Sequence, residues 1–183
     1  MSILIAYASN HGQTGRIAGR IAGVLTGDGL TVETVELERH GPWPSPEGHE
    51  AVVVAASVHQ GRHQKQVAAW VREHRDTLAA VPTALVSVSL SAAEDSDEAR
   101  TTARACADHF LEETGGWTPG RVELVAGALR YREYDVATRV LMRLIARQHG
   151  QPTDPHTDVE FTDWDGVERF AHMLAADLGA PVS

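Results

Sequence analysis

Cysteine, long apolar runs and excess positive charge are all scarce in this 183-residue chain. The single cysteine, Cys106, excludes an intramolecular disulfide and fits the reducing cytoplasm. No apolar run approaches the length that spans a bilayer, and the first apolar run begins too close to the first residue to follow a signal peptide. We therefore expect a soluble, cytoplasmic protein.

The charge balance is acidic. Asp and Glu outnumber Lys and Arg by 25 to 16, which gives a formal net charge of -9. This excess disfavours general attraction to nucleic acid, so we expect no nucleic-acid partner. With 43% hydrophobic residues and no internal repeat, residues 1–183 are predicted to form one well-buried domain. The oligomeric state stays open.

Apolar runs alternate with amphipathic segments along most of the chain. The run Ala51–Ala56 is continuously apolar, which indicates a parallel strand covered on both faces. The segment Gly41–Pro46 is rich in helix breakers and is either a loop or a poorly formed helix. The pattern predicts a doubly wound α/β fold with five parallel strands, Ile3–Ala8, Thr31–Glu36, Ala51–Ala56, Thr83–Ser89 and Arg121–Ala126, and helices at Thr14–Leu25, Lys65–Leu78, Ala99–Glu113 and Trp164–Leu178.

The turn after the first strand has the chemistry of a phosphate cradle. A strand that ends in a polar turn at a helix N-terminus offers unpaired N–H groups, hydroxyls and the positive end of the helix dipole. The turn lacks both the Gly-Lys-Ser/Thr of triphosphate loops and the three-glycine dinucleotide spacing, so it suits a phosphate monoester such as that of FMN. The alternative is an ordinary turn in which Ser9 or Thr14 caps the helix. The expected phosphate contacts are Ser9, Asn10, His11, Gly12, Gln13 and Thr14.

Two further strand ends should border a planar ring, because ligands of such sheets bind at the carboxyl ends of the strands. His59 is expected near this ring, with a solvent-facing position as the alternative. A metal site at His59 and His63 is not expected, because Gly61 interrupts any helix between them and no third ligand follows. The acidic segment Glu94–Glu98 is either a solvated face or a functional one that repels anionic partners or docks a basic redox partner. The residues predicted to border the ring are Ser57, Val58, His59, Gln60, Gly61, Ser89, Leu90 and Ser91.

The pattern breaks after the fifth strand, where residues 129–157 are predicted to form an insertion that splits the last strand, which resumes at Val159–Phe161. Its arginines form a local basic ridge on an acidic protein. This insertion is either a lid that recruits a propionate-bearing substrate, a quinone or a membrane surface, or a solvated arginine face on a packed helix. Its arginines are Arg130, Arg132, Arg139, Arg143 and Arg147.

The motifs together resemble flavodoxin-type proteins, and more closely the flavodoxin-like, quinone-dependent protoporphyrinogen oxidase family. The general likeness rests on the phosphate loop at Asn10–Thr14 and on the strand order, and Ala56-Ser57-Val58 with Gly61 is a further specific part of the match. The closer likeness rests on Val125–Tyr131 and on Phe161-Thr162-Asp163-Trp164. The chain departs from the family at Gln60, where an aromatic residue is usual, and in its acidic third loop.

The resemblance implies a flavodoxin-like fold with FMN at the strand tips. It also implies oxidation of protoporphyrinogen IX to protoporphyrin IX in heme biosynthesis, with electrons passed to a menaquinone-type acceptor. Because the flavin would carry this chemistry, no acid–base pair need be present. The side chains that could approach the ring are His59, Arg130 and Tyr131. Peripheral membrane contact would involve Arg139, Arg143 and Arg147.

Two other functions stay open at this point. The acidic third loop favours a flavodoxin-type electron carrier that docks redox proteins, whereas the basic insertion opposes it. A flavin-dependent quinone reductase, or an oxidoreductase that tailors another aromatic compound, is also compatible with the pattern, because pocket chemistry changes on a constant fold.

Overall fold

The computed structural model describes residues 1–129 and 159–179. Its centre is a sheet in which five parallel strands follow the order β2-β1-β3-β5-β6. These strands agree closely with the predicted ones and confirm the doubly wound α/β fold. Their bounds are β1 (Ser2–Ala8), β2 (Thr31–Glu36), β3 (Ala51–His59), β5 (Thr83–Ser89) and β6 (Arg121–Ala126).

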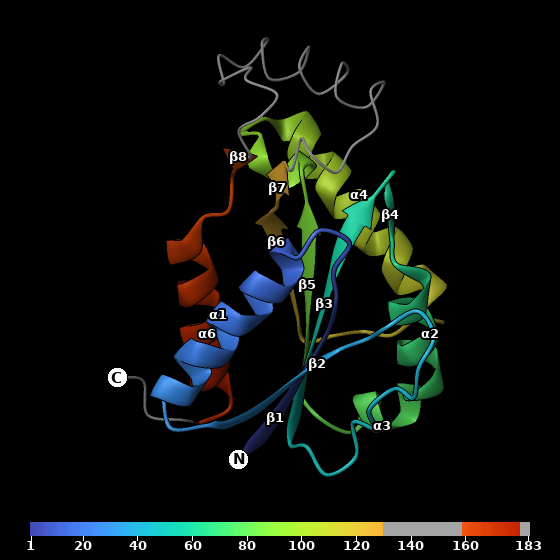
Figure 1. Ribbon diagram of the computed structural model, residues 1–183, viewed down its shortest axis with the longest axis vertical. Coiled ribbons are helices and arrows are strands. Elements are labelled where there is room, and N and C mark those ends of the chain that lie inside the picture. Colours follow the sequence, from blue (N-terminus) through green and yellow to red (C-terminus); the bar gives the residue numbers. More distant parts are fainter. Residues whose placement is uncertain (130–158, 180–183) are drawn as a thin grey trace.

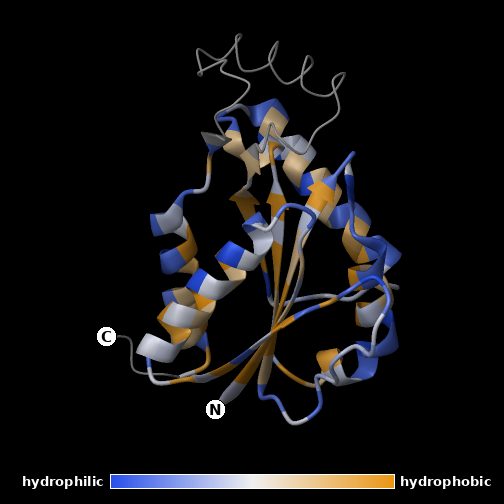
Figure 2. Cartoon of the chain, viewed as in Figure 1, coloured by the Kyte–Doolittle hydropathy of each residue, from blue (hydrophilic) through white to orange (hydrophobic). Residues whose placement is uncertain are grey.

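Helices cover both faces of the sheet (Figure 1). Helices α1 (Gln13–Gly27) and α6 (Trp164–Asp177) lie on one face. Helices α2 (Lys65–Glu73), α3 (Arg75–Ala79) and α4 (Asp97–Glu113) lie on the other. The strands between these layers are hydrophobic, whereas hydrophilic residues lie on the outer helix surfaces (Figure 2).

The alternation of side chains along β1 explains the two layers. Ile3 and Ile5 are fully buried in the core cluster beneath α1 and α6. Leu4 is fully buried in the opposite cluster, with Trp70 of α2 and Phe110 of α4. Because successive strand residues point to opposite faces, an unbroken apolar run fills both cores at once.

The prediction of one continuous helix over Lys65–Leu78 was wrong. The chain leaves helical geometry at His74, with φ -105° and ψ 18°, and this residue separates α2 from α3. The Trp70 indole donates a hydrogen bond to the Pro44 carbonyl oxygen at 2.8 Å. The turn at His74 lets Leu78 pack into the same core cluster as Trp70, so tertiary packing outweighs the local helical pattern. Gly41–Pro46, for which a loop and a poorly formed helix were both open, is a loop, since residues 37–50 contain neither helix nor strand.

Two short pairings at the carboxyl end of the sheet were not expected. Strand β4 (Arg62–His63) pairs antiparallel with the end of β3. Strand β8 (Val159–Glu160) is the resumed strand, but it pairs antiparallel with β7 (Ala128–Leu129) in a separate two-stranded sheet. The last parallel strand, β6, is therefore complete before the chain leaves for the insertion. In the described ranges, no helix combines the length and apolar character needed to cross a membrane.

Candidate functional site

Three loops meet in a cleft at the carboxyl ends of β1, β3 and β5, which are neighbours in the sheet. The cleft has an empty volume of about 430 Å³. It brings together most of the residues predicted for the site, namely Ser9, Asn10, His11, Gln13, Thr14, Ser57, Val58, His59, Ser89 and Leu90. Sequence analysis missed three of the residues that line it, Val88, Gly127 and Ala128.

Four predicted residues do not line this cleft among the described residues: Gly12, Gln60, Gly61 and Ser91. Gly12 contributes backbone geometry instead of a side chain. Gln60 and Gly61 form the tip of the β3–β4 hairpin, with φ values of 50° and 77°. Among the described residues other than glycine, Gln60 alone has a positive φ. Strained backbone of this kind is frequent at functional loops. Ser91 begins the short 3-10 helix η1 (Ser91–Ala93).

The first loop leaves polar groups unsatisfied. Gly12 precedes α1 with φ 80°, a left-handed conformation that favours glycine, and no side chain caps the helix. The alternative in which Ser9 or Thr14 is the N-cap was therefore wrong. The N–H groups of the first helical turn have no acceptor within the helix. The Thr14 hydroxyl is also buried without a hydrogen-bond partner in the described part of the chain.

These orphaned donors fit a phosphate group. A buried hydroxyl without a partner is costly unless a ligand satisfies it, and an anion at a helix N-terminus gains from the helix dipole. The loop offers no lysine or arginine of its own, which matches a monoester better than a triphosphate.

The Gln13 side chain turns away from this cradle. Its Nε2 donates to the Thr162 hydroxyl at 2.8 Å, and its Oε1 accepts from Arg16 at 3.1 Å. The Thr162 hydroxyl in turn donates to the Ala126 carbonyl oxygen at 2.8 Å. If Gln13 contacts a phosphate, its backbone N–H is the group available. Gln13 thus ties α1 to the end of β6.

The Phe161-Thr162-Asp163-Trp164 motif now has a structural explanation. Asp163 caps α6, accepting from the Gly166 N–H at 3.0 Å. The Trp164 indole donates to Glu160 at 2.6 Å, and the Arg16 guanidinium lies over the Trp164 ring, 5.3 Å from its centroid. Arg16 also pairs with Glu160 at 2.6 Å. The motif therefore fastens the base of the insertion to the helix that follows the first loop.

The side chain of Gln64 fixes the start of the second loop through two hydrogen bonds. Its Nε2 donates to the Ala8 carbonyl oxygen at 3.3 Å and to the Ser57 hydroxyl. One buried amide thereby connects the ends of β1 and β3, the strands that carry the first and second loops. No sequence motif marked Gln64 for this role.

The two histidines of the second loop have different surroundings. His59 is exposed, and its ring lies edge-on to His11 with 6.2 Å between centroids. His63 is buried, with its Nε2 2.9 Å from the Ser87 hydroxyl and its ring 4.7 Å from that of Phe110. Burial lowers the pKa of His63 to about 4, and the nearby His109 adds to this effect. His63 is thus a neutral core residue that anchors the hairpin.

The third loop closes the cleft with backbone contacts. The Ser89 hydroxyl accepts from the Ala92 N–H at 3.2 Å, and the Ser89 carbonyl oxygen accepts from the Gly127 N–H at 3.0 Å. A Cβ at Gly127 would lie 3.4 Å from Val88 Cγ1, which is an ordinary van der Waals contact. Gly127 and Ala128 form part of the cleft wall.

The acidic segment after this loop is exposed to solvent, which is compatible with both a solvated face and a docking site. The side chains of Asp95 and Asp97 are almost fully exposed and pair with Arg100 at 2.5 and 2.7 Å. Ser96 caps α4 through the Ala99 N–H at 3.1 Å. Part of the negative charge is thus neutralised locally.

The insertion residues fall outside the described residues. This applies to Arg130 and Tyr131, proposed near the ring, and to Arg132, Arg139, Arg143 and Arg147. Their predicted roles therefore stay predictions.

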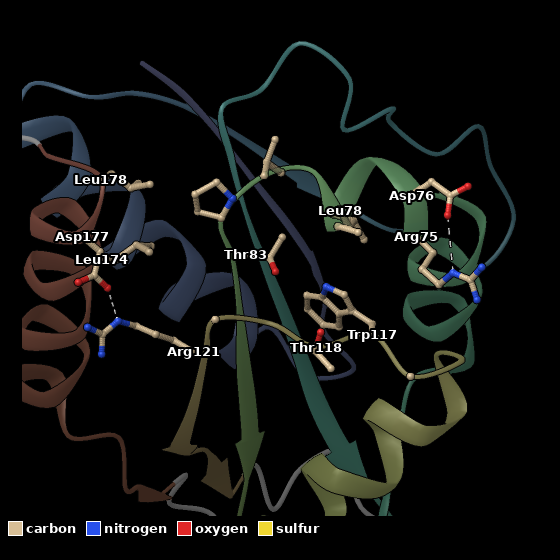
Figure 3. Close-up of a pocket in the computed structure, with 15 residues that line it drawn as sticks. Arg75, Asp76, Leu78, Thr83, Trp117, Thr118, Arg121, Leu174, Asp177 and Leu178 are labelled. Carbon is tan, nitrogen blue, oxygen red and sulfur yellow. Dashed lines mark hydrogen bonds and ion pairs between the residues drawn. The ribbon is translucent and has the colours of Figure 1, made fainter.

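A second pocket lies at the opposite, amino end of the sheet (Figure 3). Its charged side chains are in two ion pairs, Arg75 with Asp76 at 3.8 Å and Arg121 with Asp177 at 2.5 Å. Leu78, Leu174, Leu178 and Trp117 supply apolar surface. This pocket carries none of the predicted site residues.

Comparisons with known proteins agree with this geometry. The family model described as a flavodoxin domain matches residues 4–156. The protoporphyrinogen IX dehydrogenase [quinone] of Escherichia coli K12 is 32% identical over 175 residues, which cover 96% of this chain and 95% of that protein. The protein of the same name from Leishmania major is 30% identical, over 94% of this chain and 74% of that protein.

The solved structures show the same fold. A short-chain flavodoxin associated with a bacterial microcompartment superposes with a TM-score of 0.57 at 13% identity, covering 97% of this chain and 98% of that one. The chain therefore belongs to the flavodoxin-domain family, and within it to the group that contains the protoporphyrinogen IX dehydrogenases.

Proposed function

We propose that this protein is an FMN-dependent oxidoreductase that oxidises protoporphyrinogen IX to protoporphyrin IX and passes the electrons to a quinone. The observation that carries the proposal is identity of 32%, spread over 96% of the chain, to a protein named for this reaction. Family membership and an unsatisfied phosphate cradle support it.

The cofactor is FMN. We assign its phosphate to the first loop, where the Thr14 hydroxyl and the N–H groups of the first turn of α1 would donate hydrogen bonds to it. Ser9, Asn10 and His11 line the same part of the cleft. Ser57, His59 and Leu90, from the second and third loops, would border the ring.

When bound, FMN would supply two-electron redox chemistry, and three rounds, each reducing one quinone, would account for the six electrons that the overall oxidation removes. The protein's own task is to bind and orient. Gln64 holds the first two loops together, and the Ser89–Gly127 hydrogen bond closes the third side of the cleft. His59 is the titratable side chain of the second loop that lines the cleft and could donate a proton or hydrogen bond there.

The acceptor is proposed to be a menaquinone-type lipid, and protoporphyrinogen IX as substrate would place the reaction in heme biosynthesis. A lipid acceptor implies contact with a membrane surface, and we assign this contact to Arg139, Arg143 and Arg147 of the insertion. Flotation with vesicles that contain anionic lipid should recover the protein, and replacement of the three arginines by Gln should abolish recovery. Equal recovery would contradict the assignment.

The test of the function is anaerobic turnover. Purified protein, loaded with FMN and mixed with protoporphyrinogen IX and a menaquinone analogue, should form fluorescent porphyrin at a quinone-dependent rate well above autoxidation. Stoichiometric FMN binding without turnover would contradict the oxidase.

That negative result would favour the electron carrier, the second candidate. The observation on its side is the exposed acidic segment with Asp95 and Asp97, which could dock a basic protein.

A further inference from the structure

A second cleft adjoins the proposed flavin site on the far side of the β3–β4 hairpin. It lies between the end of β2, the hairpin and the start of α2, and its empty volume is about 1160 Å³. Asn10 and His59 line both clefts, so the two share a wall.

This cleft is basic on an acidic protein. Arg39, His40, Arg62 and Lys65 line it, and no Asp or Glu is among its described lining residues. Lys65 is the only lysine in the chain. It is also the first residue of α2, where the helix dipole favours an anion. Such concentration of positive charge is unexpected at a formal net charge of -9.

The cations of this cleft are also largely available for a ligand. Elsewhere in the described ranges most arginines pair with carboxylates, as Arg20 does with Glu168 and Arg104 with Asp108 at 2.9 Å. Arg72 instead donates to the Glu113 carbonyl oxygen at 3.0 Å. In the cleft, Arg62 lies 3.4 Å from Glu113. For Arg39 and Lys65, no carboxylate partner occurs among the described residues. Their charges are therefore open to an external anion.

An aromatic surface lies beside these cations. Trp43 lines the cleft, and its indole N–H already donates to the Glu38 carbonyl oxygen at 2.9 Å. The ring therefore offers apolar surface and no free donor. Apolar surface next to open cations is suited to a carboxylate carried on an aromatic or pyrrolic body.

We infer that this cleft is the carboxylate subsite of the substrate, with Arg39 and Lys65 as its anchors. The inference rests on the proposed function, because protoporphyrinogen IX carries propionate side chains on one edge of its macrocycle. If the macrocycle lies against the flavin ring, its propionates would extend past Asn10 and His59, which line both clefts, into this second cleft. The described part of the chain thus supplies a cationic site for the substrate without the arginines of the insertion.

Binding of the product, protoporphyrin IX, tests the inference directly. The FMN-loaded protein should bind the diacid about tenfold more tightly than its dimethyl ester, as measured by porphyrin fluorescence anisotropy. Arg39→Gln combined with Lys65→Gln should remove this preference and leave the Kd for FMN unchanged. Arg39→Lys combined with Lys65→Arg should retain most of it. Arg75→Gln, which removes one charge at the other end of the sheet, should have no effect.

The outcomes separate this inference from the proposed function. If the native protein does not distinguish the diacid from the ester, or if the double Gln variant still does, the inference is wrong. Oxidation of protoporphyrinogen IX with an unchanged KM in that variant would likewise refute the subsite while the function stands. If no oxidation occurs but the diacid preference depends on Arg39 and Lys65, the oxidase fails and the carboxylate site stands.

Discussion

The two ends of the parallel sheet differ in how their polar groups are satisfied. At the amino end, the charged residues of the pocket are paired within the protein, as Arg121 is with Asp177. At the carboxyl end, the Thr14 hydroxyl is buried without a partner, and the cations Arg39 and Lys65 have no carboxylate among the described residues. A buried hydroxyl without a partner is costly, and the exposed cations Arg39 and Lys65 are free to meet an anion, so the difference favours the carboxyl end as the ligand-binding end.

The largest expected effect on ligand binding at the carboxyl end of the sheet comes from substitution of Gly12. Gly12→Val places a β-branched residue at φ 80°, which should displace the start of α1 and weaken FMN binding by at least about 100-fold. Fluorescence titration of FMN measures this, with circular dichroism to show that the fold persists. Gly19→Val is the matched control, because a Cβ at Gly19 meets nothing within 4 Å. Undiminished binding by Gly12→Val would refute the phosphate assignment.

His63 connects the hairpin of the carboxyl end to the core. Its pKa in the folded protein, about 4, lies below the ordinary 6.5, so its neutral form is favoured by folding. The resulting stability is fully present above pH 6.5 and is lost as pH falls toward 4. Between pH 7.5 and 5 the free energy of unfolding should fall by about 2 kcal/mol more in the native protein than in His63→Gln.

Urea unfolding at a series of pH values measures this difference. His109→Gln is the control, because His109 shares the neighbourhood but is only partly buried. This control should keep most of the pH dependence, and identical pH profiles for the native protein and His63→Gln would contradict the prediction.

Thr14 and Thr114 compare an unsatisfied hydroxyl with a satisfied one. Thr14→Val should weaken FMN binding about tenfold without loss of apoprotein stability, because its hydroxyl has no partner in the described chain. Thr114 is fully buried and donates to the Leu111 carbonyl oxygen at 2.6 Å. Thr114→Val should therefore cost about 1 kcal/mol of stability and leave FMN affinity unchanged. If the two variants weakened FMN binding equally, the proposed role of the Thr14 hydroxyl in binding FMN would be contradicted.

The smallest effect is expected at the amino end. Arg121→Gln breaks an exposed ion pair and should change the free energy of unfolding by less than about 1 kcal/mol, with no change in FMN affinity.

Arg16→Gln, near the first loop, should weaken FMN binding about threefold, because Arg16 contacts both Gln13 and Glu160. Isothermal titration with FMN distinguishes the two variants, and a larger effect of Arg121→Gln would reverse the comparison.

Much of the site could be predicted because its signals are local. The apolar run Ile3–Ala8 and the polar turn Ser9–Thr14 are contiguous, so strand, turn and helix start can be recognised together. The Asp163 cap is local for the same reason. The β3–β4 hairpin was missed because Gln60 occupies a left-handed position that usually favours Gly or Asn.

Other residues depend on contacts that are distant in sequence. Gln64 reaches Ala8, 56 positions away, and Gln13 reaches Thr162, 149 positions away. No spacing rule marks such partners. His59 and His63 look alike in the sequence, yet one is exposed and the other is buried on Phe110.

The sequence by itself determined the layered α/β fold and the location of the polar loop proposed to bind phosphate, because apolar periodicity and turn chemistry act between neighbouring residues. Only the tertiary structure decided which polar groups are satisfied. Hydrogen bonds and ion pairs join side chains from distant segments, as between Arg121 and Asp177, and the packed core decides which of them can meet. The unsatisfied cradle at Thr14 and the open cations Arg39 and Lys65 could be identified only after those pairings were known.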